Sequence, residues 1–274
     1  MMMKVVRLAV ALIFAVTSVV FGFVYIKEKR SKDYTIPEIK ISDEMLDVDL
    51  KSKSQDYLKG VTAYDAKDGD LTDRVIVESV SKFITKGVCK VTYAVCDNDN
   101  NVVNATRKIK YKNYTSPKFG LSGSLCFSLY EPIDLFEYIS AYDCIDGGIT
   151  KNIIITSDDF AGSTEGVFTI DATVTNSKGD TSKISLPLIV EDRSVSAPKI
   201  ELSEYLIYLK LNEQKDFRSY LVSAKDSRET DITKSVRIES NINMAKEGLY
   251  SVHYYATDSF GSQGHSVLMV YVGK

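Results

Sequence analysis

The segment Gly248-Leu-Tyr-Ser-Val-His-Tyr-Tyr-Ala-Thr-Asp258 decides the fold class, because its side chains alternate in character along the chain. In an extended strand, Tyr250, Val252 and Tyr254 fall on one face, and the residues between them fall on the other. We therefore predict a strand that packs its tyrosine-rich face in a core and leaves the other face mostly in water.

The same kind of strand occurs two more times in the chain. It begins at Gly87 and Gly166 as it does at Gly248, and each copy reaches an Asp or Asn ten residues later. A short polar turn follows each copy, with Asn or Gly in its fourth place, where a hairpin commonly needs a left-handed backbone. After each turn we expect a last strand, such as Ser266–Tyr271, that closes the unit.

Two further landmarks repeat together with this strand. A Pro-led opening occurs at Pro37, Pro117 and Pro198, with spacings of 80 and 81 residues. Each opening is followed by an Ala-x-Asp sequence that has a Thr seven residues after its Asp. Because the landmarks keep one order, they indicate tandem copies of one module. The predicted modules span residues 37–114, 115–195 and 196–274.

Each module is expected to be an antiparallel β-sandwich. After residue 30 the chain shows no sustained helical period of apolar residues, and runs such as Val75–Val77 and Ile153–Ile155 are β-branched. A module of this length holds about seven short strands in two packed sheets. The sequence therefore predicts an all-β protein.

The N-terminal region is different, because Leu8–Ile26 form an apolar run of 19 residues without a charge. As a helix the run spans about 29 Å, which matches a hydrocarbon core of about 30 Å. We expect a transmembrane helix with its flanks over residues 1–30, and a spacer over residues 31–36. A cleaved signal peptide is the alternative, but its apolar region is normally about 7–15 residues long, and the best small-x-small site, Ala15-Val16-Thr17, lies inside the run.

Composition excludes several classes of function. Residues 1–30 carry a charge of +4 and the remainder carries −7, so the body offers no basic patch for nucleic acid. The chain has two His, four Cys and no Trp, and it contains no Ser-His-Asp order, phosphate-binding loop or HExxH sequence. We therefore predict no catalytic residues and no enzyme.

The sequence Ala63-Tyr-Asp-Ala-Lys-Asp-Gly-Asp-Leu-Thr72, together with the Gly87–Asp97 strand and the ending Arg107–Tyr111, resembles the bacterial immunoglobulin-like repeat of surface proteins, adhesins and crystal toxins. The second module keeps Ala141–Gly147 of this motif, and the third loosens to Ala224–Thr233 and loses the Gly. The resemblance implies three tandem immunoglobulin-like sandwiches that act as non-catalytic display modules outside a bacterium. It does not specify a ligand.

The membrane orientation follows from this resemblance rather than from charge. Lys and Arg are more numerous after the apolar run than before it, which by itself would place the modules in the cytoplasm. Long domains cross membranes largely regardless of this bias. We expect a single-pass protein of the bacterial cell membrane that contacts the bilayer through residues 8–26 and carries its C-terminal modules outside the cell.

Carboxylates recur in and after the Ala-x-Asp sequences, which makes calcium the cofactor to consider. Ca²⁺ is a hard cation that needs several oxygen ligands. Turn formation is the alternative and the expected role, because Asp and Thr side chains bond local N–H groups in tight turns and no complete ligand set can be read from the sequence. The candidate calcium ligands are Asp65, Asp68, Asp70, Asp143, Asp146, Asp226, Glu229 and Asp231.

The cysteines, histidines and tyrosines give no clear site. Cys89 is expected in a core and Cys96 on the opposite face of the same strand, whereas a bridge between Cys126 and Cys144 is the less favoured alternative to free thiols. His253 and His265 flank the last hairpin turn and are expected to face solvent, because two His without a third ligand make a poor metal site. Most tyrosines are expected in cores. Three others are candidates for an exposed recognition patch: Tyr205, Tyr208 and Tyr255.

The function that follows is membrane-anchored extracellular display, adhesion or interaction. The ligand is an extracellular protein or a polysaccharide. A cell-surface carbohydrate-binding protein, with or without calcium, is the alternative, although the absence of Trp counts against stacking on sugars. An enzyme would need a deep pocket with several perturbed titratable groups.

Overall fold

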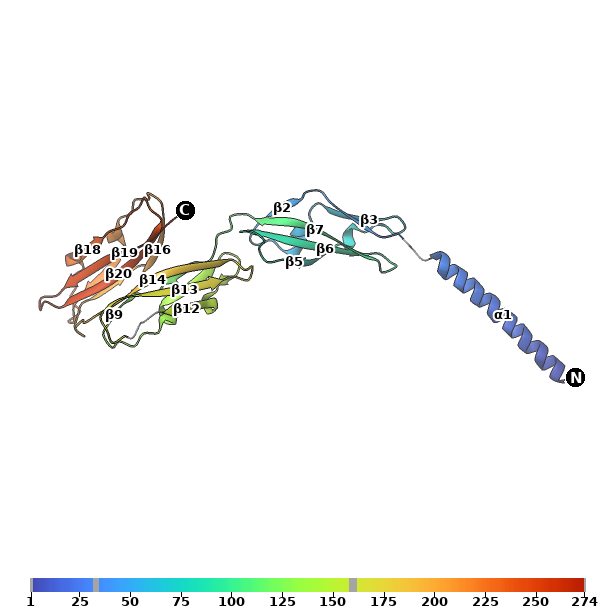
Figure 1. The fold of residues 1–274 in the computed structure, drawn as a ribbon, viewed down its shortest axis with the longest axis horizontal. Helices are drawn as coiled ribbons and strands as arrows, with labels where there is room; N and C mark the ends of the chain where they lie inside the picture. Colours follow the sequence, from blue (N-terminus) through green and yellow to red (C-terminus); the bar gives the residue numbers. More distant parts are fainter. Residues whose placement is uncertain (1, 32–34, 158–161, 274) are drawn as a thin grey trace. The chain divides into compact units, whose positions relative to one another are not determined.

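The computed structural model describes residues 2–31, 35–157 and 162–273, and it divides into two compact units (Figure 1). The first unit holds residues 1–81 and 88–111, and the second holds residues 82–87 and 112–274. Part of the predicted spacer, residues 32–34, and the last residue of the predicted third module, Lys274, lie outside the described residues. The module boundaries stay a prediction.

The N-terminal segment forms one long helix, α1 (Met2–Ser31). Its stretch Val6–Lys27 is long and apolar enough to cross a membrane, and no part of that stretch is buried against protein. Exposure of Val, Leu and Phe side chains to water is unfavourable, so this face of the helix is stabilised by an apolar environment outside the protein.

The first unit contains one sandwich of seven strands. Neighbouring strands run antiparallel, except that β2 runs parallel to β7. One sheet has the order β1 (Glu38–Ile41), β3 (Val61–Asp65), β4 (Gly69–Asp70), and the other has the order β2 (Met45–Val48), β7 (Val102–Tyr111), β6 (Val88–Cys96), β5 (Ile76–Val80). The short 3-10 helices are η1 (Ser54–Leu58) and η2 (Thr72–Arg74).

The second unit begins with a sandwich of the same topology. Its sheets have the orders β11 (Gly147–Gly148), β10 (Ile139–Asp143), β8 (Lys118–Leu121) and β12 (Ile153–Ser157), β13 (Gly166–Thr175), β14 (Thr181–Glu191), β9 (Cys126–Ser128). Strand β9 runs parallel to β14, in the same way that β2 runs parallel to β7 in the first sandwich. The helical turns are α2 (Leu135–Tyr138) and η3 (Thr150–Asn152).

The third sandwich completes the second unit. Its sheets have the orders β15 (Lys199–Leu202), β17 (Leu221–Lys225) and β16 (Leu206–Lys210), β20 (Gln263–Gly273), β19 (Gly248–Thr257), β18 (Arg237–Ser240). The 3-10 helices are η4 (Phe217–Tyr220) and η5 (Thr233–Ser235). The predicted fold class, three tandem immunoglobulin-like sandwiches after one apolar helix, is confirmed.

The hairpin turns have the predicted conformation. The fourth residues of the three turns, Asn100, Gly179 and Gly261, have φ of 66°, 83° and 86°. The residue that starts each turn, such as Asp97, accepts hydrogen bonds with its side chain from backbone N–H groups two and four residues ahead. The left-handed residue and the side-chain acceptor together specify the turn.

The third module has six strands instead of the predicted seven. Where the first two modules form β4 and β11, it has only a single bridge between Lys225 and Asp231. The loss of the Gly explains this, because the left-handed position moves to Glu229, with φ of 60°. Asp226 then accepts hydrogen bonds from Arg228 N–H and Thr230 N–H, as in the hairpin turns.

Strand β20 is buried on both faces, which joins the two sandwiches of the second unit. Leu268 and Val270 pack in the core of the third sandwich, whereas Val267 and Met269 belong to the core of the second. The neighbouring face of β19 was predicted to lie in water, and this is wrong, because His253 and the residues beside it are half-buried at this junction. The core of the second sandwich therefore continues across the junction without a break.

Gly264 provides a test of this packing. A Cβ added at Gly264 would lie 2.0 Å from the backbone O of Pro198, so we expect Gly264→Ala to lower the free energy of unfolding by about 1–3 kcal/mol or more. The measurement is chemical denaturation of the full chain in detergent micelles. Gly148→Ala is the matched control, because a Cβ there meets nothing within 4 Å, and it should be neutral or slightly stabilising. Equal stability of the two variants would contradict the packing described.

Candidate functional site at the junction of the second and third modules

Three side chains from two modules meet at the junction inside the second unit. Cys126 starts β9, Glu191 ends β14, and His265 lies near the start of β20. The Nδ1 atom of His265 lies 3.3 Å from Cys126 Sγ and 2.8 Å from Glu191 Oε1, and Cys126 Sγ lies 3.7 Å from Glu191 Oε2. We call these three residues the junction cluster.

The other ring nitrogen of His265 contacts the second histidine. His253 Nδ1 lies 2.9 Å from His265 Nε2, and the ring of Tyr255 stacks on His265 with centroids 4.4 Å apart. Burial lowers the pKa of His253, and the charge of His265 acts in the same direction. These neighbours hold the His265 ring in one orientation.

Arg193 closes another side of the junction cluster. Its guanidinium donates from one terminal nitrogen to His265 O at 2.9 Å and from the other to Cys126 O at 2.8 Å. Its Nε lies 3.8 Å from Glu191 Oε2. One side chain therefore ties the backbones of both modules together next to the cluster.

The protonation of the junction cluster follows from its burial. Burial raises the pKa of the Cys126 thiol to about 12, so in this surrounding it keeps its proton at neutral pH. The hydrogen bond from His265 lowers the pKa of Glu191 although burial opposes it. The thiol is therefore not an activated nucleophile.

The arrangement is not that of a catalytic triad. In a triad the nucleophile and the acid contact different nitrogens of the histidine, but here Cys126 and Glu191 both face Nδ1 of His265. The three groups converge on one point instead. Among the residues that the structure describes, this is the only group of three His, Cys, Asp or Glu with potential ligand atoms all within 4.8 Å of one another.

A surface cavity gives access to the junction cluster. It has a volume of about 610 Å³, and its lining includes Glu191, Arg193, Tyr255 and His265. The cluster is thus buried on the Cys126 side but can be reached from solvent beside Glu191, whose side chain is 34% exposed.

Several sequence-based expectations are corrected here. His265 does not face solvent, since only 6% of it is exposed. The alternative bridge between Cys126 and Cys144 is not formed, and both thiols are free. Cys144 Sγ donates to Thr115 O at 3.3 Å. Cys89 is fully buried, as predicted. The sequence does not reveal the burial of the histidines, because the side chains that cover them come from another module.

The candidate recognition tyrosines are not a shared exposed patch. Tyr255 stacks in the junction, and the Tyr208 hydroxyl bonds both the N–H and the O of Phe119. Tyr205 is half-buried and accepts from Leu202 N–H. The signal that would have found the junction is the unbroken apolar run Val267–Val272, which is typical of a strand with both faces buried.

The calcium candidates of the first module accept local hydrogen bonds. Asp65 Oδ1 accepts from the N–H groups of Lys67 and Asp68, and the bond from Asp68 contributes most to lowering the Asp65 pKa. Asp68 accepts from both the N–H and the side-chain amide of Asn98. Asp70 accepts from Thr72 N–H. These carboxylates connect the acidic turn to the hairpin turn.

The second and third modules use their acids in the same way. Asp143 Oδ1 accepts from two backbone N–H groups, and Asp146 accepts from Ser177 N–H and Oγ. Asp226 and Asp231 accept from local N–H groups, and Glu229 pairs with Lys225 Nζ at 3.1 Å. Calcium binding by the eight acids stays an untested alternative to turn formation, and among the described residues no three of them bring potential ligand atoms together.

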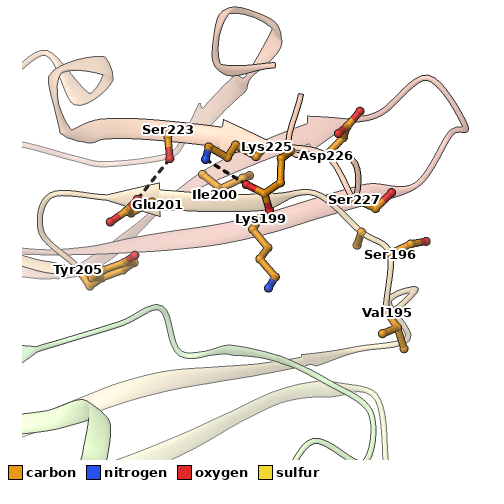
Figure 2. A pocket seen from close by; sticks show the side chains of 12 residues that line it. Val195, Ser196, Lys199, Ile200, Glu201, Tyr205, Ser223, Lys225, Asp226 and Ser227 are labelled. Atoms are coloured by element: carbon orange, nitrogen blue, oxygen red, sulfur yellow. Dashed lines mark hydrogen bonds and ion pairs between the residues drawn. The ribbon is translucent and has the colours of Figure 1, made fainter. Parts of the chain in front are cut away.

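A second cavity of about 490 Å³ lies on the third module, and Figure 2 shows its polar lining. Ser223 Oγ donates to Glu201 at 3.3 Å, and Lys225 pairs with Glu229. Lys199 extends from β15, and its ammonium group takes part in neither of these two interactions in Figure 2. Tyr205 lies at one end of the cavity. The cavity offers polar groups and one aromatic ring to a ligand.

Comparison with known proteins gives a family match for part of the chain. Residues 208–272 match the model of the family described as "Bacterial surface protein, Ig-like domain". This match lies within the third module. The resemblance to bacterial immunoglobulin-like repeats is thereby confirmed for the third module. The first two modules share its sequence landmarks.

Two relatives cover about half of the chain. The pesticidal crystal protein Cry22Aa of Bacillus thuringiensis is 32% identical over 136 residues, which are 49% of this chain and 18% of that protein. An uncharacterized 81.3 kDa protein of Acholeplasma phage L2 is 29% identical over 135 residues, or 48% of this chain and 18% of that protein. The chain therefore matches less than a fifth of each relative's length.

A solved structure of the M60 catalytic domain with the CBM51-1 and CBM51-2 domains of Clostridium perfringens ZmpB is 16% identical. It covers 89% of this chain and 31% of that chain, with a TM-score of 0.25. A likeness of this size assigns no ligand.

The hairpin acids give a prediction for pH. Desolvation raises the pKa of Asp97, but hydrogen bonds from Asn101 and Asp99 outweigh it and lower the pKa below its usual value near 3.9. A carboxylate with a lowered pKa stabilises the fold at pH values above its unfolded pKa, and this contribution is lost as the pH falls through the folded pKa. The second module has Asn176 at this position, and its Oδ1 accepts the same two backbone hydrogen bonds. The further bond from Asn101 Nδ2 to Asp97 Oδ2 is specific to the first module. Asp97→Asn should therefore melt within a few degrees of the wild type at pH 6 and lose less on acidification to pH 3.

Asp97→Ala is the matched control, because it removes the acceptor altogether. It should melt several degrees lower at both pH values, as followed by circular dichroism of the full chain in micelles. An Asp97→Asn variant that melts as low as Asp97→Ala would show that the charge, and not the acceptor geometry, holds the turn.

The acidic turns give a second prediction. Since their oxygens already accept local N–H groups, the melting temperature of the full chain should be the same, within about a degree, in millimolar calcium and in chelator. Magnesium serves as the control cation. A rise of several degrees with calcium alone would instead assign the eight acids a metal-binding role.

Proposed function

We propose that this protein is a non-catalytic, membrane-anchored display and interaction protein of a bacterial cell surface. The observation that carries the proposal is the order of parts along the chain. An unburied apolar helix, α1, precedes three sandwiches, and the last of these matches a surface-protein family. The helix retains the chain in the membrane, and the modules face outward.

The helix supports anchoring rather than packing within the protein. Side chains such as Phe14, Val20 and Phe23 are at least half exposed along its length. The hydrocarbon core of a bilayer accepts such a helix because all its interior backbone hydrogen bonds are internal. Thr17 Oγ1 donates to the backbone O of Ile13, so even this polar group is satisfied within the helix.

The ligand is an extracellular protein or a polysaccharide. The polar cavity of the third module supports this proposal, because Lys199, Glu201 and Tyr205 offer charge, hydrogen bonds and a ring surface together (Figure 2). Stacking on a sugar ring is one use of such a tyrosine. The cavity is open and the carboxylate of Glu201 is paired with Ser223, which fits recognition better than chemistry.

Protease treatment of intact bacterial protoplasts that express the full chain tests the orientation. Outward modules are cut without lysis, while a cytoplasmic marker enzyme stays whole. Modules that are cut only after lysis would overturn outward display. The mass of the membrane-extracted chain tests retention, since an uncleaved chain keeps its 30.6 kDa, and a chain shortened by the apolar helix would identify a signal peptide instead.

Charge placed in α1 gives the prediction for anchoring. Phe14→Arg combined with Val20→Arg adds roughly 2.5–3.5 kcal/mol per Arg to the cost of membrane insertion, so we expect the variant to move from the membrane pellet to the soluble fraction after alkaline extraction. Phe14→Leu with Val20→Leu is the control and should stay in the pellet. A double-Arg variant that remains fully in the pellet would contradict a membrane-spanning role for the helix.

A further inference from the structure

We propose that the junction cluster of Cys126, Glu191 and His265 is a binding site for a divalent transition metal of the zinc type. The ligand atoms are a thiol sulfur, an imidazole nitrogen and a carboxylate oxygen, which are the three ligand types that Zn²⁺ uses in proteins. The site joins the second module to the third, since Cys126 and Glu191 come from one and His265 from the other.

The distances between the ligand atoms fit a tetrahedral ion. With usual zinc–ligand bond lengths, the edges of the tetrahedron between S, N and O ligands are about 3.4–3.6 Å. The corresponding separations are 3.3 Å between Cys126 Sγ and His265 Nδ1, 2.8 Å between Nδ1 and Glu191 Oε1, and 3.7 Å between Sγ and the other carboxylate oxygen, Oε2. Small shifts of the Glu191 carboxylate therefore bring all three atoms into bonding range of one ion.

The orientation of His265 is the one that metal-binding histidines adopt. A ligating histidine usually bonds a neighbour through its second ring nitrogen, which fixes the ring and its tautomer. Here Nδ1 faces Cys126 and Glu191, while Nε2 contacts His253 Nδ1 at 2.9 Å. Without an ion, Nδ1 donates to Glu191. Binding of an ion places the ring proton on Nε2, which donates to His253, and gives the Nδ1 lone pair to the ion.

The charges also fit a divalent cation. A bound ion replaces the Cys126 proton, so that one thiolate and one carboxylate balance its two positive charges. Arg193 directs its terminal nitrogens to the carbonyls of Cys126 and His265, while its Nε lies 3.8 Å from Glu191 Oε2 and adds one positive charge beside the cluster. The cavity beside Glu191 and His265 provides an entry path and room for water as a fourth ligand.

The cluster is specific to this junction and is not part of the repeated module. Strand pairing places Cys126 opposite Ile189, and the equivalent pairs are Asp47 with Lys110 in the first module and Tyr208 with Tyr271 in the third. The residues equivalent to Cys126 and Glu191 are Asp47 and Lys112 in the first module, and Tyr208 and Gly273 in the third. The other two modules therefore lack this pair of ligands.

Co²⁺ titration of the full chain tests the site. The chain is held in detergent micelles with a phosphine reductant, because cobalt bound by thiolate absorbs in the near ultraviolet and reports tetrahedral geometry in the visible. We expect one Co²⁺ per chain with a thiolate charge-transfer band, and displacement of that band by one equivalent of Zn²⁺. A chain that shows no such band overturns the proposal without any variant.

Variants assign the band to the cluster. Cys126→Ser should abolish it, and His265→Gln should weaken Co²⁺ affinity by at least 10-fold. Cys144→Ser is the matched control, since Cys144 is a free thiol of the same module outside the cluster, and it should keep the band. Circular dichroism checks that each variant is folded. A band that survives in folded Cys126→Ser, or disappears in Cys144→Ser, overturns the assignment.

Discussion

The burial of β20 on both faces is the constraint on which the second unit depends. A strand at the surface of a sandwich needs only one apolar face, but β20 presents Leu268 and Val270 to its own core and Val267 and Met269 to the core of the preceding module. Each buried side chain of this size is worth roughly 1.5–3 kcal/mol when it is removed from water. The two modules are therefore stabilised together, and the polar groups enclosed between them need partners at that junction.

The junction cluster supplies these hydrogen-bond partners. Cys126, Glu191 and His265 bond one another, and Arg193 satisfies the carbonyls of Cys126 and His265. Polar groups that are buried between two bodies specify one register, because any shift leaves donors or acceptors without partners. A surface protein that has to present its modules in a defined arrangement gains from such a device, with or without an ion.

The acidic motif of the repeat has a structural use in every module. Asp65, Asp143 and Asp226 each accept N–H groups of their own turn, and in the first two modules the next carboxylate reaches the hairpin turn, through Asn98 and Ser177. This explains why carboxylates persist in the third module although the Gly is lost. The motif therefore identifies a bacterial immunoglobulin-like repeat without identifying a ligand site, and the chemistry specific to this chain lies elsewhere.

The sequence alone determined the apolar helix, the three modules, the two-sheet fold and the left-handed turn residues. These are local properties: the period of Tyr250, Val252 and Tyr254, or a Gly at position 261, constrains the backbone within a few residues. Only the tertiary structure decided that His265 is buried and meets Cys126 and Glu191, which lie 139 and 74 residues away. No periodicity links such positions, because their contact arises when one module's outer face packs on another. Alternation along a strand shows that its two faces differ, but it does not show what covers the second face.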